Sequence, residues 1–339
     1  MKLYYYKDAK GNFGDDINGW LWERLMPGIW DDDERHSFSG IGTILGPEMQ
    51  LDRKWTIFGS GAGYGEVPAG VGGKNWDIVC VRGPLTATIL NLPRELAVSD
   101  GALLIRALEE FQPVPEAERK GIVFMPHHQA LSAGDWKQAC DLAGIEFISP
   151  HDDSIQTLNR LRHAKLVIAD AMHAAIVADT VRVPWVPVVT SLEISTFKWL
   201  DWTMSMNLPY NPIRLPQSTP QEMIRSESLF MFGKRQTFAD KTIEDAMERY
   251  RAHTRMTKSW YWSPRVKLGG GLYKHILYPM AHSFPKGYML PGSEKRSVER
   301  AAEALRKATL APSYLSDDTH YDATLARMLS LVDEVRSRY

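Results

Sequence analysis

Short apolar segments alternate with amphipathic ones along the first two thirds of the chain, and polar or glycine-containing turns separate them. Short apolar runs bounded by turns predict buried strands, whereas an apolar residue at every third or fourth position predicts a helix. In the first half, this pattern predicts strands at residues 3–6, 40–45, 55–58 and 78–81, and helices over 17–25 and from 84 onward. Residues 98–102 repeat the arrangement of a strand that ends at a polar turn.

The second half continues the alternation. We predict strands at residues 121–125, 166–169 and 185–189 and a further strand from 147, with helices over 135–143, 154–163 and 172–179. Strands that alternate with helices form parallel sheets, and ligands bind at the carboxyl ends of such strands. The sequence therefore predicts an α/β fold of two Rossmann-like domains that face a cleft.

The domain organisation follows from shifts in composition. Residues 112–120 are rich in proline and charge, which is typical of a connector. We expect an N-terminal domain over 1–115 and a second domain over 120–225. From about 226 the pattern is largely helical, most clearly at 242–251 and 297–310, which predicts a C-terminal extension over 226–339.

Composition narrows the class of protein. Apolar residues make up 44% of the 339 positions and charged residues 24%, which excludes intrinsic disorder. The 40 lysines and arginines nearly balance 41 acidic residues, so we expect no nucleic-acid partner. Cys80 and Cys140 form neither a disulfide framework nor a zinc motif, which indicates a reducing compartment. The sequence lacks a recognisable secretory signal and any apolar run long enough to span a membrane, so we expect a cytoplasmic protein.

Residues 250–296 form the most polarised segment, with nine lysines or arginines against one acid, Glu294, and several interleaved aromatic residues. Cationic and amphipathic aromatic side chains together suit contact with an anionic membrane. The alternative is a solvated basic surface with aromatic residues packed beneath it.

Two polar turns of the first half carry candidate chemistry. Asn12-Phe13-Gly14-Asp15-Asp16 offers hydrogen bonds to hydroxyl groups and a carboxylate base, although an aspartate there can also cap a helix. The glycine-rich loop around Gly61 is either an anion-binding nest or a plain turn or lid; it fails the dinucleotide fingerprint, because Tyr64 and Glu66 occupy the third-glycine positions.

Further candidates follow predicted strands. Arg82 can bind a phosphate or carboxylate or form a structural salt bridge, and Asp100 is either a site residue or a helix cap. His173, with Asp170 near enough to tune it, suits general acid catalysis, with a structural histidine as the alternative. His127 and His128 bind substrate or cap a turn. No spacing specifies a metal site.

The order of these motifs resembles the polysaccharide pyruvyl transferase family, and within it the succinoglycan-type ketal pyruvyltransferases. The resemblance covers about the first 215 residues and runs through motifs at 4–7, 12–16, 40–45, 81–86, 99–102, 125–128, 169–178 and 195–199. It implies a fold like the GT-B glycosyltransferases and phosphoenolpyruvate as the donor substrate, with no other cofactor. Pyruvate is joined through C2 to two hydroxyls of one sugar, commonly O4 and O6, as phosphate leaves.

The resemblance also implies a lipid-linked oligosaccharide acceptor, bound by the N-terminal domain at the inner face of the cell membrane, with the donor on the second domain. We assign His173 as the acid and Asp15 or Asp16 as the base. Substrate-binding roles fall to Asn12, Gly14, Gly61, Arg82, Asp100, His127, His128 and Lys198. Many relatives carry an arginine two positions before the histidine, where this chain has Ala171, so we reassign donor anchoring to Arg82 and Lys198.

Two other functions fit the same sequence. A nucleotide-sugar-dependent glycosyltransferase has the same expected two-domain shape, because a fold does not fix a function. A non-catalytic carbohydrate-binding subunit of a polymer-synthesis complex is the other alternative, and Ala171 is the feature that favours it.

Overall fold

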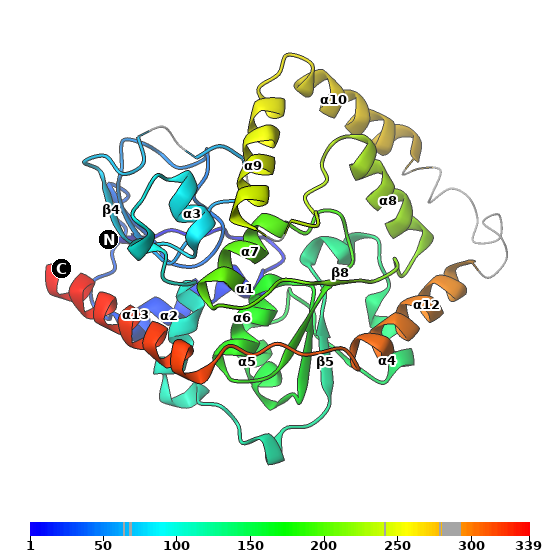
Figure 1. Ribbon diagram of the computed structural model, residues 1–339, viewed down its shortest axis with the longest axis horizontal. Helices are drawn as coiled ribbons and strands as arrows, with labels where there is room; N and C mark the ends of the chain where they lie inside the picture. Colours follow the sequence, from blue (N-terminus) through cyan, green and yellow to red (C-terminus); the bar gives the residue numbers. More distant parts are fainter. Residues whose placement is uncertain (64, 68–69, 241, 278, 280–292) are drawn as a thin grey trace.

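The computed structural model describes residues 1–63, 65–67, 70–240, 242–277, 279 and 293–339. Each half of the chain contributes one sheet, and all strand pairs in both are parallel (Figure 1). The first sheet has the order β1 (Lys2–Leu3), β2 (His36–Ser39), β3 (Lys54–Phe58), β4 (Trp76–Cys80). The second has the order β6 (Glu146–Phe147), β5 (Ile122–Met125), β7 (Leu166–Ala169), β8 (Trp185–Val189), β9 (Ile213–Arg214). The predicted α/β class with parallel sheets is therefore confirmed.

Helices connect and cover the strands. Around the first sheet lie α1 (Phe13–Asp16), α2 (Asn18–Leu25), α3 (Pro84–Ile89) and the 3₁₀ turns η1 (Arg94–Leu96), η2 (Gly101–Ala107), η3 (Glu109–Phe111) and η4 (Glu116–Glu118). The second sheet carries η5 (His128–Ser132), α4 (Trp136–Ala143), α5 (Ser154–His163), α6 (Met172–Thr180) and α7 (Thr196–Ser205). The last third forms α8 (Pro220–Met231), α9 (Ile243–Thr257), α10 (Trp262–Leu272), a π-helical turn η6 (Tyr273–Leu277), α12 (Ser293–Ala308) and α13 (Asp318–Arg338).

Three predicted strands of the first half differ from the structure, and at the one expected before Asp100 the chain forms only an isolated bridge between Ala97 and Val81. The first strand is only Lys2–Leu3, and residues 40–45 form a bent segment that follows β2, which the hydrophobic pattern did not predict. Gly42 adopts a φ of 113°, a left-handed conformation that a regular strand cannot contain. The segment therefore leaves the sheet after Ser39 and carries Thr43 toward the space between the two sheets.

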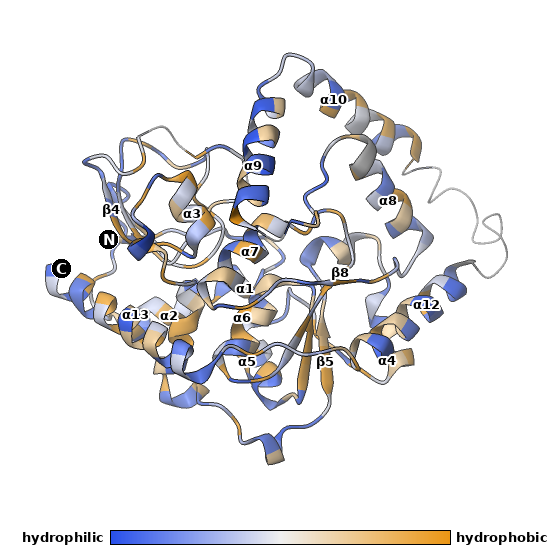
Figure 2. Cartoon of the chain, viewed as in Figure 1, coloured by the Kyte–Doolittle hydropathy of each residue, from blue (hydrophilic) through white to orange (hydrophobic). Residues whose placement is uncertain are grey.

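One hydrophobic core runs from the first sheet into the second. Trp22 packs edge-on against Phe38 and Phe58, and this cluster is continuous with the buried residues of β7 and α6. Figure 2 shows the hydrophobic strands around β5 with helices to either side of them. Each large apolar side chain buried here contributes about 1.5 to 3 kcal/mol, so the shared core resists relative displacement of the two sheets.

The C-terminal helices return to both sheets. Helix α12 packs against α4 beside the second sheet, while α13 crosses to the opposite side of the molecule and contacts η2 (Figure 1). Arg338 at the end of α13 forms an ion pair of 2.8 Å with Asp77 of β4. Residues 226–339 thus contribute to the packing around both sheets.

Candidate functional site

A cavity of about 770 Å³ lies between the segments that follow the strands of the two sheets. The first half of the chain supplies Asn12, Gly14, Asp15 and Thr43, and the second half supplies His127, His128, Ala171, His173 and Lys198. Seven of the eleven predicted site residues line this space, namely Asn12, Gly14, Asp15, His127, His128, His173 and Lys198. We therefore take this cleft as the candidate active site.

The Asn12–Asp16 segment joins the two halves of the cleft. The Phe13 backbone N–H donates to the Pro150 carbonyl at 2.8 Å, and the Phe13 ring is buried. Asp16 accepts the Asn12 backbone N–H at 2.8 Å, whereas Asp15 accepts the Asn12 side-chain amide at 2.7 Å and faces the cavity. The structure thus separates two residues that the sequence left equivalent: Asp16 holds the turn, and Asp15 is the candidate base.

Burial changes the acidity of Asp15. Removal of the carboxyl from water raises its pKa from 3.8 to about 6, although the nearby positive charges of His173 and Lys198 lower it. A carboxylate with a pKa close to the working pH is suited to accept a proton from a sugar hydroxyl and to release it afterwards.

Close packing holds the His173 ring in the first turn of α6. A methyl group on Gly14 would lie 1.9 Å from His173 Nδ1, so only glycine leaves space for this ring. On the other edge of the ring, Nε2 lies 3.6 Å from Asp100 Oδ2, and both atoms are buried without a hydrogen-bond partner. The other oxygen of Asp100 accepts the Ala102 backbone N–H at 3.0 Å, which fixes the carboxylate. Asp100 is therefore both the helix cap and the partner that faces the imidazole.

The expected partnership between His173 and Asp170 is wrong. Asp170 accepts the backbone N–H of His127 at 2.8 Å and the backbone N–H and hydroxyl of Thr190 at 3.0 and 2.6 Å. These bonds occupy both of its carboxylate oxygens, so Asp170 ties the loop after β5 to the loop after β8. Asp100, which comes from the first half of the chain, occupies the position beside His173 that was expected for Asp170.

His127 and His128 lie side by side with ring centroids 4.3 Å apart. Burial, together with the charges of His128 and Lys198, holds the pKa of His127 well below its ordinary value, and burial lowers the pKa of His128 to about 4. Both rings are thus neutral at pH 7 and can bind hydroxyl groups, but they bring no positive charge to an anionic substrate.

Positive charge enters the cleft from Lys198 on α7 and from Lys234. Helix α6 also begins at the cavity, and Ala171 at its N-cap provides no side-chain hydrogen bond to the first turn. The positive end of the α6 dipole therefore faces the cleft at Ala171.

Arg82 requires a correction, because it is fully buried and does not line the cleft. Its guanidinium donates to the Asp201 carboxylate at 3.0 Å, to the Thr43 hydroxyl at 2.7 Å and to the Ala62 carbonyl at 2.8 Å. This is the structural salt bridge that the sequence left as the alternative. Arg82 positions Thr43, which lines the cavity, and does not itself reach the donor.

The glycine-rich loop around Gly61 does not form the expected anion-binding nest. The Gly59, Gly61 and Ala62 amides donate to Cys80, Gly42 and Thr86, respectively, so these N–H groups are already used within the protein. A methyl group on Gly61 would lie 2.2 Å from the guanidinium carbon of Arg82. Gly61 therefore makes room for a structural side chain.

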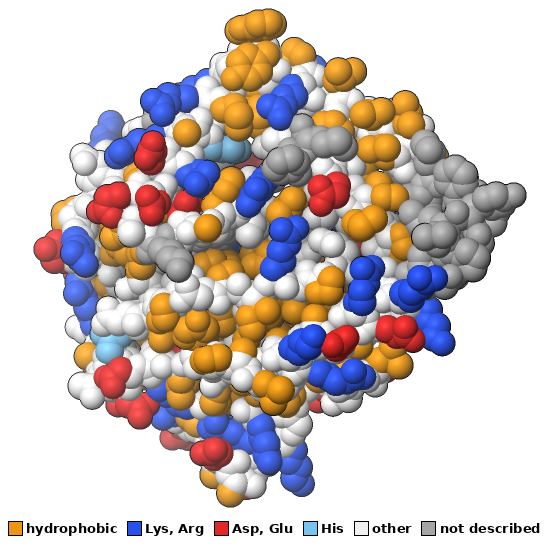
Figure 3. Space-filling model, turned by 45° about the vertical axis from the view of Figure 1, so that its right-hand side comes forward, with side chains coloured by type: hydrophobic (Ala, Val, Ile, Leu, Met, Phe, Trp, Pro, Cys, Tyr) orange, Lys and Arg blue, Asp and Glu red, His pale blue; other side chains and the backbone are white. Residues whose placement is uncertain are grey.

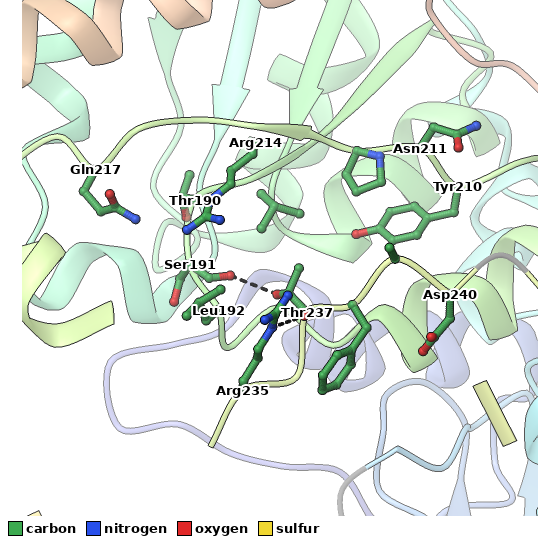
Figure 4. A pocket seen from close by; sticks show the side chains of 14 residues that line it. Thr190, Ser191, Leu192, Tyr210, Asn211, Arg214, Gln217, Arg235, Thr237 and Asp240 are labelled. Carbon is green, nitrogen blue, oxygen red and sulfur yellow. Dashed lines mark hydrogen bonds between the residues drawn. The ribbon is translucent and has the colours of Figure 1, made fainter. Parts of the chain in front are cut away.

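A second cavity, of about 330 Å³, lies beyond one wall of the cleft (Figure 4). The segment that separates them alternates in direction, because Lys234 and Gln236 line the cleft whereas Arg235 and Thr237 line the second cavity. The Gln236 backbone N–H donates to the Leu192 carbonyl at 2.8 Å and so attaches this segment to the loop after β8. The smaller cavity contains none of the predicted site residues.

Sequence reasoning missed several residues of the cleft. Thr43 lay in a motif that we treated as a strand, and Lys234 and Gln236 lay in the expected C-terminal extension. Glu193 also lines the cleft and is held by an ion pair of 2.6 Å with Arg225. No local motif distinguishes these positions, because distant segments bring them together.

Two further properties concern the whole described chain. Within the ranges given above, no group of three or more His, Cys, Asp or Glu side chains is arranged to hold a metal ion. No helix in that part of the chain combines the length and apolar character needed to cross a membrane. Residues 278 and 280–292 of the predicted basic-aromatic segment lie outside the described residues.

The fold and cleft define a parallel α/β protein with a candidate acid–base site between its two sheets. Comparison with known proteins gives the family. The chain is 33% identical to the succinoglycan biosynthesis protein ExoV of Rhizobium meliloti (strain 1021) over 342 residues that cover 100% of both chains. It belongs to the succinoglycan-type pyruvyltransferase family, as its motifs indicated. No family profile and no solved structure matches it, and the GT-B arrangement and the domain boundaries stay predictions.

Proposed function

We propose that this protein transfers pyruvate from phosphoenolpyruvate to two hydroxyls of one sugar in a lipid-linked exopolysaccharide repeat unit. The relative is named for succinoglycan biosynthesis, which supports a polysaccharide of that type as the product. One observation carries the proposal: a carboxylate with a raised pKa, Asp15, shares a cavity with His173, whose ring faces Asp100. Formation of a ketal from an enol ester needs both a proton donor and a proton acceptor in one site.

The first step protonates the donor. His173 gives a proton to the methylene carbon of phosphoenolpyruvate, which becomes a methyl group and leaves a cationic centre at C2. The imidazolium that supplies this proton is stabilised by the buried carboxylate of Asp100, 3.6 Å from Nε2. Asp100 acts here as a positioning residue, because it faces His173 and does not line the cavity.

The second step forms the two carbon–oxygen bonds. A sugar hydroxyl attacks C2 and transfers its proton to Asp15, which gives a tetrahedral phosphoketal. The C2–O bond to phosphate then breaks, a second hydroxyl of the same sugar attacks C2, and its proton returns to the imidazole of His173. Asp15 gives its proton to the departing phosphate. The sugar thus loses two hydroxyl protons in all, of which one balances the proton gained by the methyl group and the other leaves with phosphate.

Donor anchoring requires several positive partners, because the phosphate and the carboxylate are both anionic. Lys198 and Lys234 supply charge, and the uncapped start of α6 at Ala171 supplies the positive end of a helix dipole. The neutral rings of His127 and His128 then suit the sugar hydroxyls of the acceptor.

The test is incubation of the purified protein with phosphoenolpyruvate and the oligosaccharide acceptor. We expect stoichiometric phosphate release and a product heavier by one pyruvic acid less one water, as mass spectrometry would show. His173→Ala should abolish both signals while leaving the folded protein intact. Transfer from a nucleotide sugar without phosphoenolpyruvate turnover would establish the glycosyltransferase alternative, and oligosaccharide binding with no product from either donor would establish the non-catalytic one.

A further inference from the structure

The turn between α9 and α10 exposes large apolar side chains to solvent. Trp260 is 88% exposed and Leu268 is 79% exposed, values far above those of the buried tryptophans in the core. Figure 3 shows hydrophobic side chains gathered at the top of the molecule, where this turn lies, with lysine and arginine side chains beside them. Exposed clusters of this kind mark contact sites.

The exposed residues form one stripe along α10. Tyr261, Leu268, Leu272 and Ile276 follow one another at helical spacing, and each is exposed. The adjoining face of the helix is packed against the protein, since a methyl group on Gly269 would lie 2.0 Å from the Phe232 ring. The apolar stripe therefore presents a solvent-accessible surface that is most open at Leu268.

Charge indicates what covers this stripe. Residues 249–277 contain seven lysines and arginines and no aspartate or glutamate. Lys267 and Lys274 are exposed, lie within two residues of the stripe and share one side of it at helical spacing, while Lys258 pairs with Glu66 at 2.7 Å. An apolar stripe flanked by cations matches the surface of an anionic bilayer, which offers acyl chains below phosphate groups.

The same segment also forms part of the cleft. His253, Thr257 and Trp262 line the cavity, and Trp260 lies between the last two in the sequence with its side chain in solvent. A surface that docks through Trp260 and Leu268 thus brings the rim of the cleft to the membrane.

We propose that the α9–α10 turn and the outer face of α10 dock on an anionic phospholipid surface, with Trp260 and Leu268 inserted and Lys267 and Lys274 at the phosphate groups. This rests on the proposed function, because docking places the cleft beside an acceptor sugar whose lipid stays in the bilayer. The orientation explains why one segment carries both cavity residues and exposed apolar residues.

The test uses the full chain and sedimentation with vesicles of phosphatidylglycerol and phosphatidylcholine or of phosphatidylcholine alone. We expect binding to the anionic vesicles that weakens with added salt. Replacing both anchors, Trp260→Ser with Leu268→Ser, should weaken binding by about 100-fold, because each large apolar side chain contributes about tenfold or more. The charge variant Lys267→Glu with Lys274→Glu should lose the preference for anionic lipid.

Leu310 provides the matched control, because it is 86% exposed at the end of α12 and lies outside the stripe. Leu310→Ser should bind vesicles like the wild-type protein. Equal vesicle binding by the wild-type protein and the Trp260/Leu268 variant would overturn the proposal. So would a wild-type protein that binds no vesicles but self-associates, if the Trp260/Leu268 variant no longer self-associates. Transfer to a water-soluble oligosaccharide should be unchanged in the Trp260/Leu268 variant, so failure of docking and failure of the proposed chemistry are distinguished.

Discussion

Replacement of Asp15 by asparagine should stabilise the protein and abolish its proposed activity at the same time. Raising the pKa of this carboxyl from 3.8 to about 6 makes its ionised form about 3 kcal/mol less favourable in the folded protein than in the unfolded chain. Water that reaches the partly exposed side chain reduces this figure, so we expect Asp15→Asn to increase the free energy of unfolding by about 1 to 3 kcal/mol at pH 7.5. Asparagine retains an oxygen that can accept the Asn12 amide.

The sign of the effect follows from proton binding. Between pH 4 and pH 6 the folded protein keeps a proton on Asp15 that the unfolded chain releases, so the wild-type protein loses stability as the pH rises through this window. The advantage of Asp15→Asn is therefore complete above pH 6 and disappears toward pH 4. Urea unfolding at pH 7.5 and pH 4.5 measures the difference between the two proteins.

The same variant tests the role of Asp15 as the base. Phosphate release should fall by about 10² to 10⁴ in kcat, and the decline of wild-type kcat/KM below about pH 6 should be absent from the residual activity. Asp16→Asn removes the same charge from the same helix and is the control, for which we expect no gain in stability, because Asp16 accepts a backbone N–H. The reasoning would be refuted if the difference in unfolding free energy between Asp15→Asn and the wild-type protein were no larger at pH 7.5 than at pH 4.5.

Three other substitutions test the supports of the cleft. Arg82→Met leaves the Asp201 carboxylate buried without its ion-pair partner, so the free energy of unfolding measured in urea should fall by about 3 to 5 kcal/mol. Unaltered stability with a raised donor KM would instead restore Arg82 as a donor ligand. Gly14→Ala places a methyl group in the space of the His173 ring, so calorimetry should show a lower melting temperature, and we expect kcat to fall by about tenfold or more. Asp100→Asn keeps the hydrogen bond from the Ala102 backbone N–H and removes the charge that faces His173, so kcat should fall while the donor KM stays constant. A raised donor KM with unchanged kcat would assign Asp100 to donor binding.

The fold of the second half was accessible from the sequence to a high degree. The observed bounds of β7, β8 and α5 are those that the pattern predicted, because buried apolar runs stand between clear terminal signals. Asp153, for example, accepts the Gln156 backbone N–H at 2.9 Å and starts α5 where an N-cap residue precedes the helical pattern. The first half was less accessible, because the apolar residues at 40–45 have strand-like composition but Gly42 turns the chain away from the sheet.

The candidate site divides in the same way. Motif order indicated His173, Lys198 and either Asp15 or Asp16, and the structure brings His173, Lys198 and Asp15 to one cavity. It did not identify Asp100 as the partner of His173, since these residues are far apart in the sequence and meet only where η2 contacts α6.

The sequence alone determined the local elements and the chemistry on offer, because strand and helix periods, caps and ionisable groups depend on residues a few positions apart. Tertiary structure decided which groups share the cleft and which serve only to hold it. Arg82 and Lys198 have the same charge and were both assigned to donor anchoring, yet the first is fully buried against Asp201 and the second faces the cavity. Burial and partners depend on contacts between distant segments, and these contacts also set the pKa of Asp15.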